Sequence, residues 1–225
     1  MVGKDLHKWM VQGLDLIYPR KCPFCQCILR EPDQPLCADC QSKLPWLLGQ
    51  EAGRKVEFAE NCFSPLRYRG PVPEAVKRYK FGRKQSYGAK FGLLLAQCIQ
   101  DQGLPELEFV TWTPLSKRRL RHRGFDQAEL LARATAECLA LPLVPTLRKV
   151  RHTAAQSGLN GEAARRANAL GAYELLPGVE LAGKTVLLID DVVTSGATLS
   201  ECARLLRQEG AVVYCGTLAQ ARDGR

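Results

Sequence analysis

The sequence has no long hydrophobic segment, no internal repeat and no low-complexity tract. Its 225 residues contain no run of roughly 18 uncharged apolar residues, so no segment is predicted to cross a membrane. The dinucleotide-binding pattern G-x-G-x-x-G is absent, which argues against a Rossmann-type site, and a P-loop is not expected. Histidine is scarce, at three residues, and no side chain stands out as a general base. We expect His122 and His152 to contact phosphate or solvent.

The chain does have an ordinary apolar content and an excess of positive charge. A hydrophobic fraction of 46% over 225 residues is enough for one packed α/β domain with a small appendage. The net charge of +9 favours an anionic partner such as phosphate, nucleic acid or anionic lipid. Residues 1–18 place apolar side chains at helical spacing between charged ones, which predicts an amphipathic helix and not a targeting signal. We therefore predict a cytoplasmic protein without membrane insertion.

Five of the ten cysteines cluster within residues 22–40. They include two C-x-x-C pairs, formed by Cys22, Cys25, Cys37 and Cys40. Two such pairs can point four thiolates at one centre, which predicts a structural zinc ion with no open position for water. An iron–sulfur centre or a redox pair remains open, and a disulfide is the weaker alternative in a cytosolic protein. Cys27 is a spare thiol that could replace Cys25 as a ligand, and a ribbon of this size could also bind nucleic acid or protein.

After residue 50 the chain alternates strand-like and helix-like patterns. Strands are predicted at residues 63–68, 107–113, 145–150, 185–190 and 211–219, and helices at 73–82, 87–100, 124–141, 162–170 and 197–210. This alternation predicts an α/β fold, with a parallel sheet flanked by helices. Two domains are expected, with the helix and zinc ribbon in residues 1–50 and the α/β domain in residues 51–225. Residues 45–62 are expected to connect them.

The stretch KTVLLIDDVVTSGATL, residues 184–199, joins a predicted buried strand to a predicted helix. Asp190 and Asp191 come at the carboxyl end of that strand, where open α/β sheets bind ligands. The turn that follows offers free backbone N–H groups, a glycine and hydroxyls, which together suit a phosphate. Its residues are Thr194, Ser195, Gly196, Ala197 and Thr198.

The two acids need a different ligand from the turn, because carboxylates repel phosphate. A carboxylate accepts hydrogen bonds strongly from paired sugar hydroxyls, so the combined stretch predicts a site for a ribose 5-phosphate. The alternative is a helix cap with incidental acids, but adjacent carboxylates at a buried edge are costly without partners.

Six basic side chains occupy the seven positions from Lys117 to Arg123. This segment follows the strand predicted at residues 107–113, so it is expected at the same sheet edge as the acids. Guanidinium groups match phosphate oxygens bidentately. We therefore predict that Lys117, Arg118, Arg119 and Arg123 bind a pyrophosphate. A solvated basic turn or a nucleic-acid patch is the alternative.

The stretch from the apolar strand to the turn resembles the loop that binds phosphoribosyl pyrophosphate (PRPP) in type I phosphoribosyltransferases. The shared features are an apolar strand, two acids, two apolar residues and a phosphate turn rich in threonine and glycine. The resemblance implies that Asp190 and Asp191 hold the ribose hydroxyls and that residues 194–198 hold the 5-phosphate. It also implies that Mg²⁺ accompanies PRPP.

Two further stretches narrow the resemblance to the ComF/GntX family. They are PLSKRRLRHRGFDQAELLA, residues 114–132, and RKVRHTAAQSGLNGEAARRANALGAYEL, residues 148–175. Paired C-x-x-C motifs near the N-terminus are also typical of this family. The chain departs from the family pattern at Asp126 (usually Asn), Tyr173 (often Phe) and Ser195 (usually Thr). Cys62 stands alone where many relatives carry a second cysteine pair.

The resemblance implies displacement of pyrophosphate at C1 of PRPP by an acceptor that the sequence does not name. It also implies an association with competence, DNA uptake or DNA utilisation, with single-stranded DNA or the DNA-uptake machinery as possible partners. The alternative is a non-enzymatic factor that keeps the PRPP fold and binds nucleotides or single-stranded DNA, using the ribbon and residues 117–123. The oligomeric state is not indicated.

Overall fold

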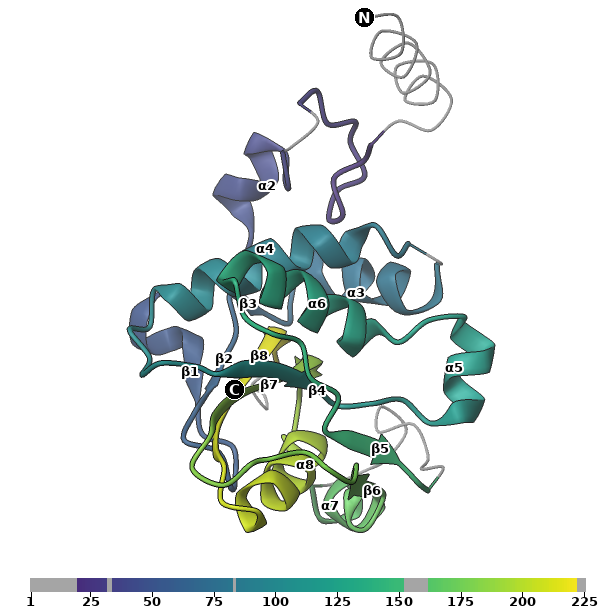
Figure 1. The fold of residues 1–225 in the computed structure, drawn as a ribbon. Coiled ribbons are helices and arrows are strands. Elements are labelled where there is room, and N and C mark those ends of the chain that lie inside the picture. The colour runs from purple at the N-terminus through teal and green to yellow at the C-terminus, as the bar shows by residue number, and fades with distance from the viewer. Residues whose placement is uncertain (1–19, 32–33, 83, 152–161, 222–225) are drawn as a thin grey trace, which may run out of the picture. The chain divides into compact units, whose positions relative to one another are not determined.

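The computed structural model describes residues 20–31, 34–82, 84–151 and 162–221 (Figure 1). The chain divides into two compact units, Met1–Leu44 and Pro45–Arg225. The helix predicted at residues 1–18 lies outside the described residues, and the expected domain boundary at residue 50 remains a proposal. No helix within the described ranges has the length and apolar character needed to cross a membrane.

The first unit is built around two tight turns, each of which carries one C-x-x-C pair. In the first turn the Cys22 N–H donates to the Cys27 carbonyl at 2.8 Å, and Gln26 adopts a left-handed backbone conformation with φ of 68°. The second turn begins the short helix α2 (Ala38–Lys43), where the Cys37 sulfur accepts from the Cys40 N–H at 3.4 Å. Both turns therefore present two thiols on one side of the backbone.

The second unit contains a mostly parallel sheet in the order β1-β2-β8-β7-β4, with β3 also paired to β8. Its strands are β1 (Gly53–Arg54), β2 (Cys62–Phe63), β3 (Leu66–Arg67), β4 (Phe109–Trp112), β7 (Thr185–Val193) and β8 (Val212–Gln220). All pairs are parallel except β1–β2, which is antiparallel. The predicted α/β class is thus confirmed.

The central strands β7 and β8 are buried on both faces, as their unbroken apolar sequences predict. The side chains of Val186, Leu187, Leu188 and Ile189 are all fully buried. The strand β7 runs on past its apolar part because β8 continues beside it as far as the pair Val193–Gln220. The prediction that the strand ends at Asp190 is therefore wrong, because both acids lie within β7.

Helices cover both faces of the sheet (Figure 1). The helices α3 (Val72–Phe81), α4 (Tyr87–Gln100) and α6 (Gln127–Leu139) lie on one face, and α7 (Glu162–Ala169) and α8 (Ala197–Gln208) on the other. All five were predicted from the sequence. The helices α4 and α6 pack closely at Gly92, where a Cβ atom would come within 2.4 Å of the Ala134 Cβ.

Three segments differ from the sequence-based expectations. Residues 45–62 are not a plain connector, because they form the short 3₁₀ helix η1 (Gly49–Ala52) and β1 and reach β2 at the sheet edge. The strand predicted at residues 145–150 is β5 (Leu147–Lys149), which pairs with β6 (Tyr173–Leu175) in a separate antiparallel sheet. The basic segment, for which no helix was predicted, is the helix α5 (Lys117–Arg123).

Candidate functional site

The four cysteines of the first unit form a compact cluster. The sulfur atoms of Cys22, Cys25, Cys37 and Cys40 all lie within 4.8 Å of one another, and Cys25 and Cys37 are separated by 3.5 Å. Tetrahedral zinc with Zn–S bonds of about 2.3 Å separates its sulfurs by about 3.8 Å, so this donor set fits the ion. Cys27 is not one of these four, but its thiol hydrogen-bonds to those of Cys25 and Cys37. The predicted ligand set thus comes together in space.

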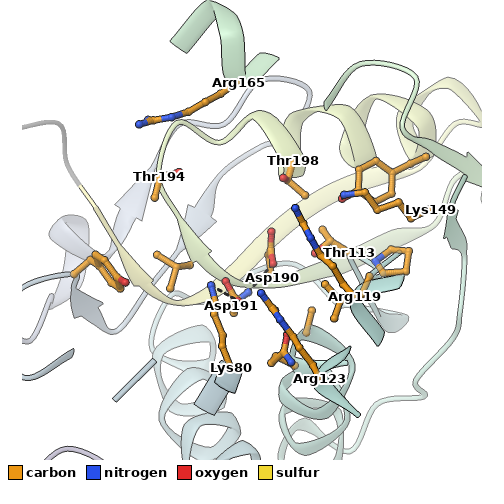
Figure 2. A pocket seen from close by; sticks show the side chains of 17 residues that line it. Lys80, Thr113, Arg119, Arg123, Lys149, Arg165, Asp190, Asp191, Thr194 and Thr198 are labelled. Atoms are coloured by element: carbon orange, nitrogen blue, oxygen red, sulfur yellow. Dashed lines mark hydrogen bonds and ion pairs between the residues drawn. The ribbon is translucent and has the colours of Figure 1, made fainter. Parts of the chain in front are cut away.

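In the second unit, a pocket of about 290 Å³ opens where β4 and β7 end (Figure 2). It gathers six of the residues predicted for the site, namely Asp190, Asp191, Thr194, Thr198, Arg119 and Arg123. It also brings in residues that were not predicted for the site, among them Lys80, Thr113, Lys149, Arg165 and Tyr173. The pocket therefore combines two acids with five cations.

The two acids of β7 have different partners. The Asp191 carboxylate forms an ion pair with the Lys80 ammonium at 2.9 Å, and Lys80 comes from the end of α3. One Asp190 carboxylate oxygen accepts from the Asp191 N–H at 2.8 Å, and the Thr113 hydroxyl also hydrogen-bonds to Asp190. Burial, together with the neighbouring Asp191 charge, raises the pKa of Asp190 well above its ordinary value. The pocket thus holds negative charge at a cost that a bound hydroxyl or cation would relieve.

The turn before α8 forms a small hollow beside these acids. Gly196 has φ of 79° and caps the helix, a left-handed conformation that favours glycine. The hollow has a volume of about 20 Å³, and four of the five predicted turn residues line it: Thr194, Gly196, Ala197 and Thr198. Ser195 does not line it, and its hydroxyl accepts from the Ala197 N–H at 3.5 Å. Free N–H groups at a helix N-terminus suit an anion.

The helix α5 directs only part of its positive charge into the pocket. It begins after Ser116, whose hydroxyl accepts from the Arg119 N–H at 3.4 Å, and ends at Gly124 with φ of 81°. Arg119 and Arg123 line the pocket, one helical turn apart. The other two predicted pyrophosphate ligands, Lys117 and Arg118, are exposed and do not line it.

Asp126 hydrogen-bonds to the segments on both sides of α5. One carboxylate oxygen caps α6 by accepting from Ala128 N at 3.0 Å and Glu129 N at 3.3 Å, and the other accepts from Leu115 N at 2.7 Å. Burial raises the pKa of Asp126 to about 6, against these stabilising hydrogen bonds. Asp126 thus ties both flanks of α5 together, whereas an asparagine in its place could not accept from all three donors.

The residues that sequence reasoning missed come from separate elements. Lys80 lies in α3, Lys149 in β5, Arg165 in α7 and Tyr173 in β6. For Lys149, Arg165 and Tyr173 a signal existed, because all three fall in the stretch of residues 148–175 that carries the family resemblance. No such signal pointed to Lys80, since it is one of several basic residues on an amphipathic helix.

A P-loop is not expected, yet residues 178–185, GVELAGKT, fit the pattern G-x-x-x-x-G-K-[ST]. The fold excludes that role, because a P-loop joins a strand to a following helix, whereas this stretch leads into strand β7. Its lysine is also occupied, since the Lys184 ammonium donates to the Glu108 carboxylate at 2.6 Å. The other Glu108 oxygen accepts from the Thr185 N–H at 2.7 Å.

Known protein families match both units. The family described as "Phosphoribosyl transferase domain" matches residues 126–225, and "Double zinc ribbon domain" matches residues 13–56. Fold and sites together define a type I phosphoribosyltransferase-like protein with an N-terminal zinc ribbon.

Similar proteins identify the family. The chain is 32% identical to DNA utilization protein YhgH of Salmonella typhi over 203 residues, which cover 86% of this chain and 82% of that one. It is 28% identical to competence protein F of Haemophilus influenzae, with 84% and 92% covered. The chain therefore belongs to the ComF family. Among solved structures, the allosteric regulatory enzyme of purine biosynthesis matches 60% of this chain and 26% of its own at 24% identity and a TM-score of 0.40, an overlap too limited to support a conclusion.

The cysteine cluster generates the first prediction. Purified protein should contain about one zinc per chain, and Cys37→Ser should lose most of it, because the oxygen replaces one of four thiolates. Metal analysis measures the zinc content of both full-length proteins, and a thermal melt measures their stability. Cys138→Ser is the control, since Cys138 is an exposed cysteine on α6 in the second unit, and it should keep its zinc. Full zinc retention in Cys37→Ser contradicts the assignment.

Asp126 generates the second prediction. Because its pKa is raised from 3.8 to about 6 in the folded state, its contribution to stability is full at low pH and is lost as pH rises toward 6. As the pH rises from 5 to 7, wild type should lose about 1 kcal/mol of unfolding free energy through this group. Asp126→Asn cannot titrate there and should not show this loss. Urea unfolding at several pH values measures the difference. Asp101→Asn, a change at an exposed residue, is the control. Parallel stability curves for wild type and Asp126→Asn would show that the carboxyl does not titrate in this range.

Proposed function

We propose that this chain binds PRPP in the pocket between β4, β7 and α5 and transfers its phosphoribosyl group to an acceptor, with release of pyrophosphate. The carrying observation is the pair Asp190 and Asp191 beside the hollow at the start of α8, with Arg119 and Arg123 lining the same pocket. This arrangement offers acceptors for hydroxyls, donors for one phosphate and cations for a second, more highly charged group.

Each part of the pocket then has one role. The hollow at the start of α8 would receive the 5-phosphate through backbone N–H groups and the hydroxyls of Thr194 and Thr198. Asp190 and Asp191 would accept from the ribose hydroxyls, directly or through Mg²⁺, since carboxylate and phosphate oxygens are the ligands that Mg²⁺ prefers. Arg119 and Arg123 would hold the pyrophosphate, whose charge their guanidinium groups match.

The chemistry needs little from the protein beyond position and charge. The bond between C1 and the pyrophosphate oxygen breaks, the electron pair leaves with pyrophosphate, and the acceptor forms the new bond at C1. Arg119 and Arg123 would stabilise the negative charge that develops on the leaving group, while the acids and the hollow hold the ribose in place.

The biological setting is proposed from the relatives. Proteins named for competence and for DNA utilisation align with more than four-fifths of this chain. A role in competence, DNA uptake or DNA utilisation follows, with the DNA-uptake machinery as a partner. A cytoplasmic location, where a zinc–thiolate site stays reduced, is part of this proposal.

A second candidate function is binding of single-stranded DNA without transfer. One observation favours it: four cationic or titratable residues of α5, namely Lys117, Arg118, Arg121 and His122, are exposed and do not line the pocket. Such a solvent-facing basic surface suits a nucleic-acid backbone. The two functions thus use opposite faces of one helix, and variants can separate them.

The acids generate the third prediction. Asp190→Asn with Asp191→Asn should weaken binding of PRPP with Mg²⁺ at least tenfold, because a hydrogen bond to a charged group contributes about 1.5–3 kcal/mol. Removing the two charges relieves their mutual repulsion but also leaves the Lys80 ammonium without its ion-pair partner, so stability without ligand should change little. Inorganic phosphate should bind no worse, because the hollow is intact. Calorimetric titration measures the two affinities, and a thermal melt measures the stability. PRPP affinity equal to that of wild type would contradict the proposed PRPP site.

The basic helix generates the fourth prediction. Arg119→Ala should lower PRPP affinity at least tenfold and leave affinity for a single-stranded oligonucleotide nearly unchanged. The matched variant Arg118→Ala with Arg121→Ala removes charge from the exposed face of the same helix and should do the reverse. Calorimetry with PRPP and fluorescence anisotropy with a labelled oligonucleotide distinguish them. If neither pair of measurements changes, α5 has no part in binding either ligand.

A further inference from the structure

Lys149 is a pocket cation for which the proposed PRPP site has no use. It lies on β5, in the small antiparallel sheet, and lines the 290 Å³ pocket. Its ammonium donates to the Tyr173 hydroxyl at 2.9 Å and lies 4.6 Å from the centre of the Tyr173 ring. No ion pair in the described part of the chain includes Lys149, whereas Lys80, across the pocket, has Asp191. Lys149 is therefore a half-buried positive charge whose recorded partner is a neutral hydroxyl.

The charged groups around Lys149 favour the binding of an anion. Burial, reinforced by Arg119 on α5 and Arg151 beyond β5, lowers the pKa of Lys149 to about 8. Asp190 on β7 and Cys202 on α8 act in the opposite direction, and the pKa of the Cys202 thiol is itself raised far enough by burial to keep it neutral. An anionic group beside the Lys149 ammonium would offset both the desolvation and the repulsion.

The 5-phosphate of PRPP does not account for this charge. The hollow at the start of α8 is lined by residues of β7, the turn and α8, and Lys149 is not among them. The Tyr173 side chain stands between the two, since it hydrogen-bonds to both Lys149 and Thr198. Figure 2 shows Lys149 on the side of the pocket away from Lys80 and Asp191. With the 5-phosphate assigned to the hollow and the pyrophosphate to Arg119 and Arg123, an anion at Lys149 is assigned to a second molecule in the pocket.

We propose that Lys149 and Tyr173 form an anion subsite for the acceptor, and that the acceptor of the transfer carries a carboxylate. The inference rests on the proposed PRPP site and names the substrate class that this site would use. Lys149 would bind one carboxylate oxygen, and the Tyr173 hydroxyl would orient the ammonium toward it. Neither side chain takes part in bond making at C1, so both would determine specificity.

The test uses matched acids and amides. Nicotinate and nicotinamide, and anthranilate and 2-aminobenzamide, are titrated into the full-length protein with excess ribose 5-phosphate and Mg²⁺, where no pyrophosphate can be released. Wild type should bind each acid at least tenfold more tightly than its amide. Lys149→Met should reduce that preference to within twofold, and Lys149→Arg should restore most of it. Arg148→Met is the control, because Arg148 is the exposed neighbour on β5 and pairs with Glu174 outside the pocket.

A pH series adds a readout that a purely structural role would not change. The preference of wild type for the acids should fall as pH rises through about 8, where Lys149 loses its proton, and Lys149→Arg should keep its preference at pH 9. No preference in wild type, or the same preference in Lys149→Met, overturns the inference.

PRPP titrations separate this inference from the proposed function. Lys149→Met should bind PRPP within threefold of wild type, and a tenfold loss would make Lys149 a PRPP ligand and overturn the acceptor subsite. If wild type binds PRPP but shows no preference for acids, only the inference fails. If wild type prefers acids through Lys149 but does not bind PRPP, the anion subsite stands and the proposed transfer fails.

Discussion

Two adjacent carboxylates on the central strand set the charge arrangement of the second unit. Asp190 and Asp191 lie in β7, which the sheet holds between β8 and β4, so neither can move to solvent without breaking strand pairing. Their charge has to be offset where it stands. Lys80 reaches Asp191 from α3, and Arg119 and Arg123 face the same pocket from α5. The helices α3 and α5 thus place cations around the two carboxylates of the strand β7.

Much of the fold could be predicted because its signals are local. The buried strands β7 and β8 and the helices α3, α4, α6, α7 and α8 follow from apolar spacing, and the start of α8 follows from a glycine and hydroxyl turn. What could not be predicted depends on pairing between distant segments. The extension of β7 through both acids requires β8 beside it, and β5 leaves the main sheet because it pairs with β6, which lies more than twenty residues later. The same reason hid Lys80, because its partner Asp191 is brought near only by the fold.

The two units achieve stability by different means. The second unit buries a continuous apolar core on both faces of its sheet. The first unit ends at Leu44 and is too short for a core of that kind, because small domains bury a smaller share of their surface. Four thiolates on two turns offer an alternative, since metal binding supplies folding free energy directly. The charge-dependent pocket and the metal-dependent ribbon can therefore respond to different conditions.

The ion pair of Lys184 with Glu108 has a consequence for genetic screens. Lys184 and Glu108 join the amino ends of β7 and β4, and Thr185 and Asp191 lie six residues apart on one strand, or about 20 Å at 3.3 Å per residue. A change at Lys184 would remove a partly exposed ion pair, of a kind that contributes about 0–1 kcal/mol, and Glu108 would still accept from the Thr185 N–H. A Lys184 variant would therefore leave the distant pocket intact, although residues 178–185 match the pattern of a nucleotide-binding loop.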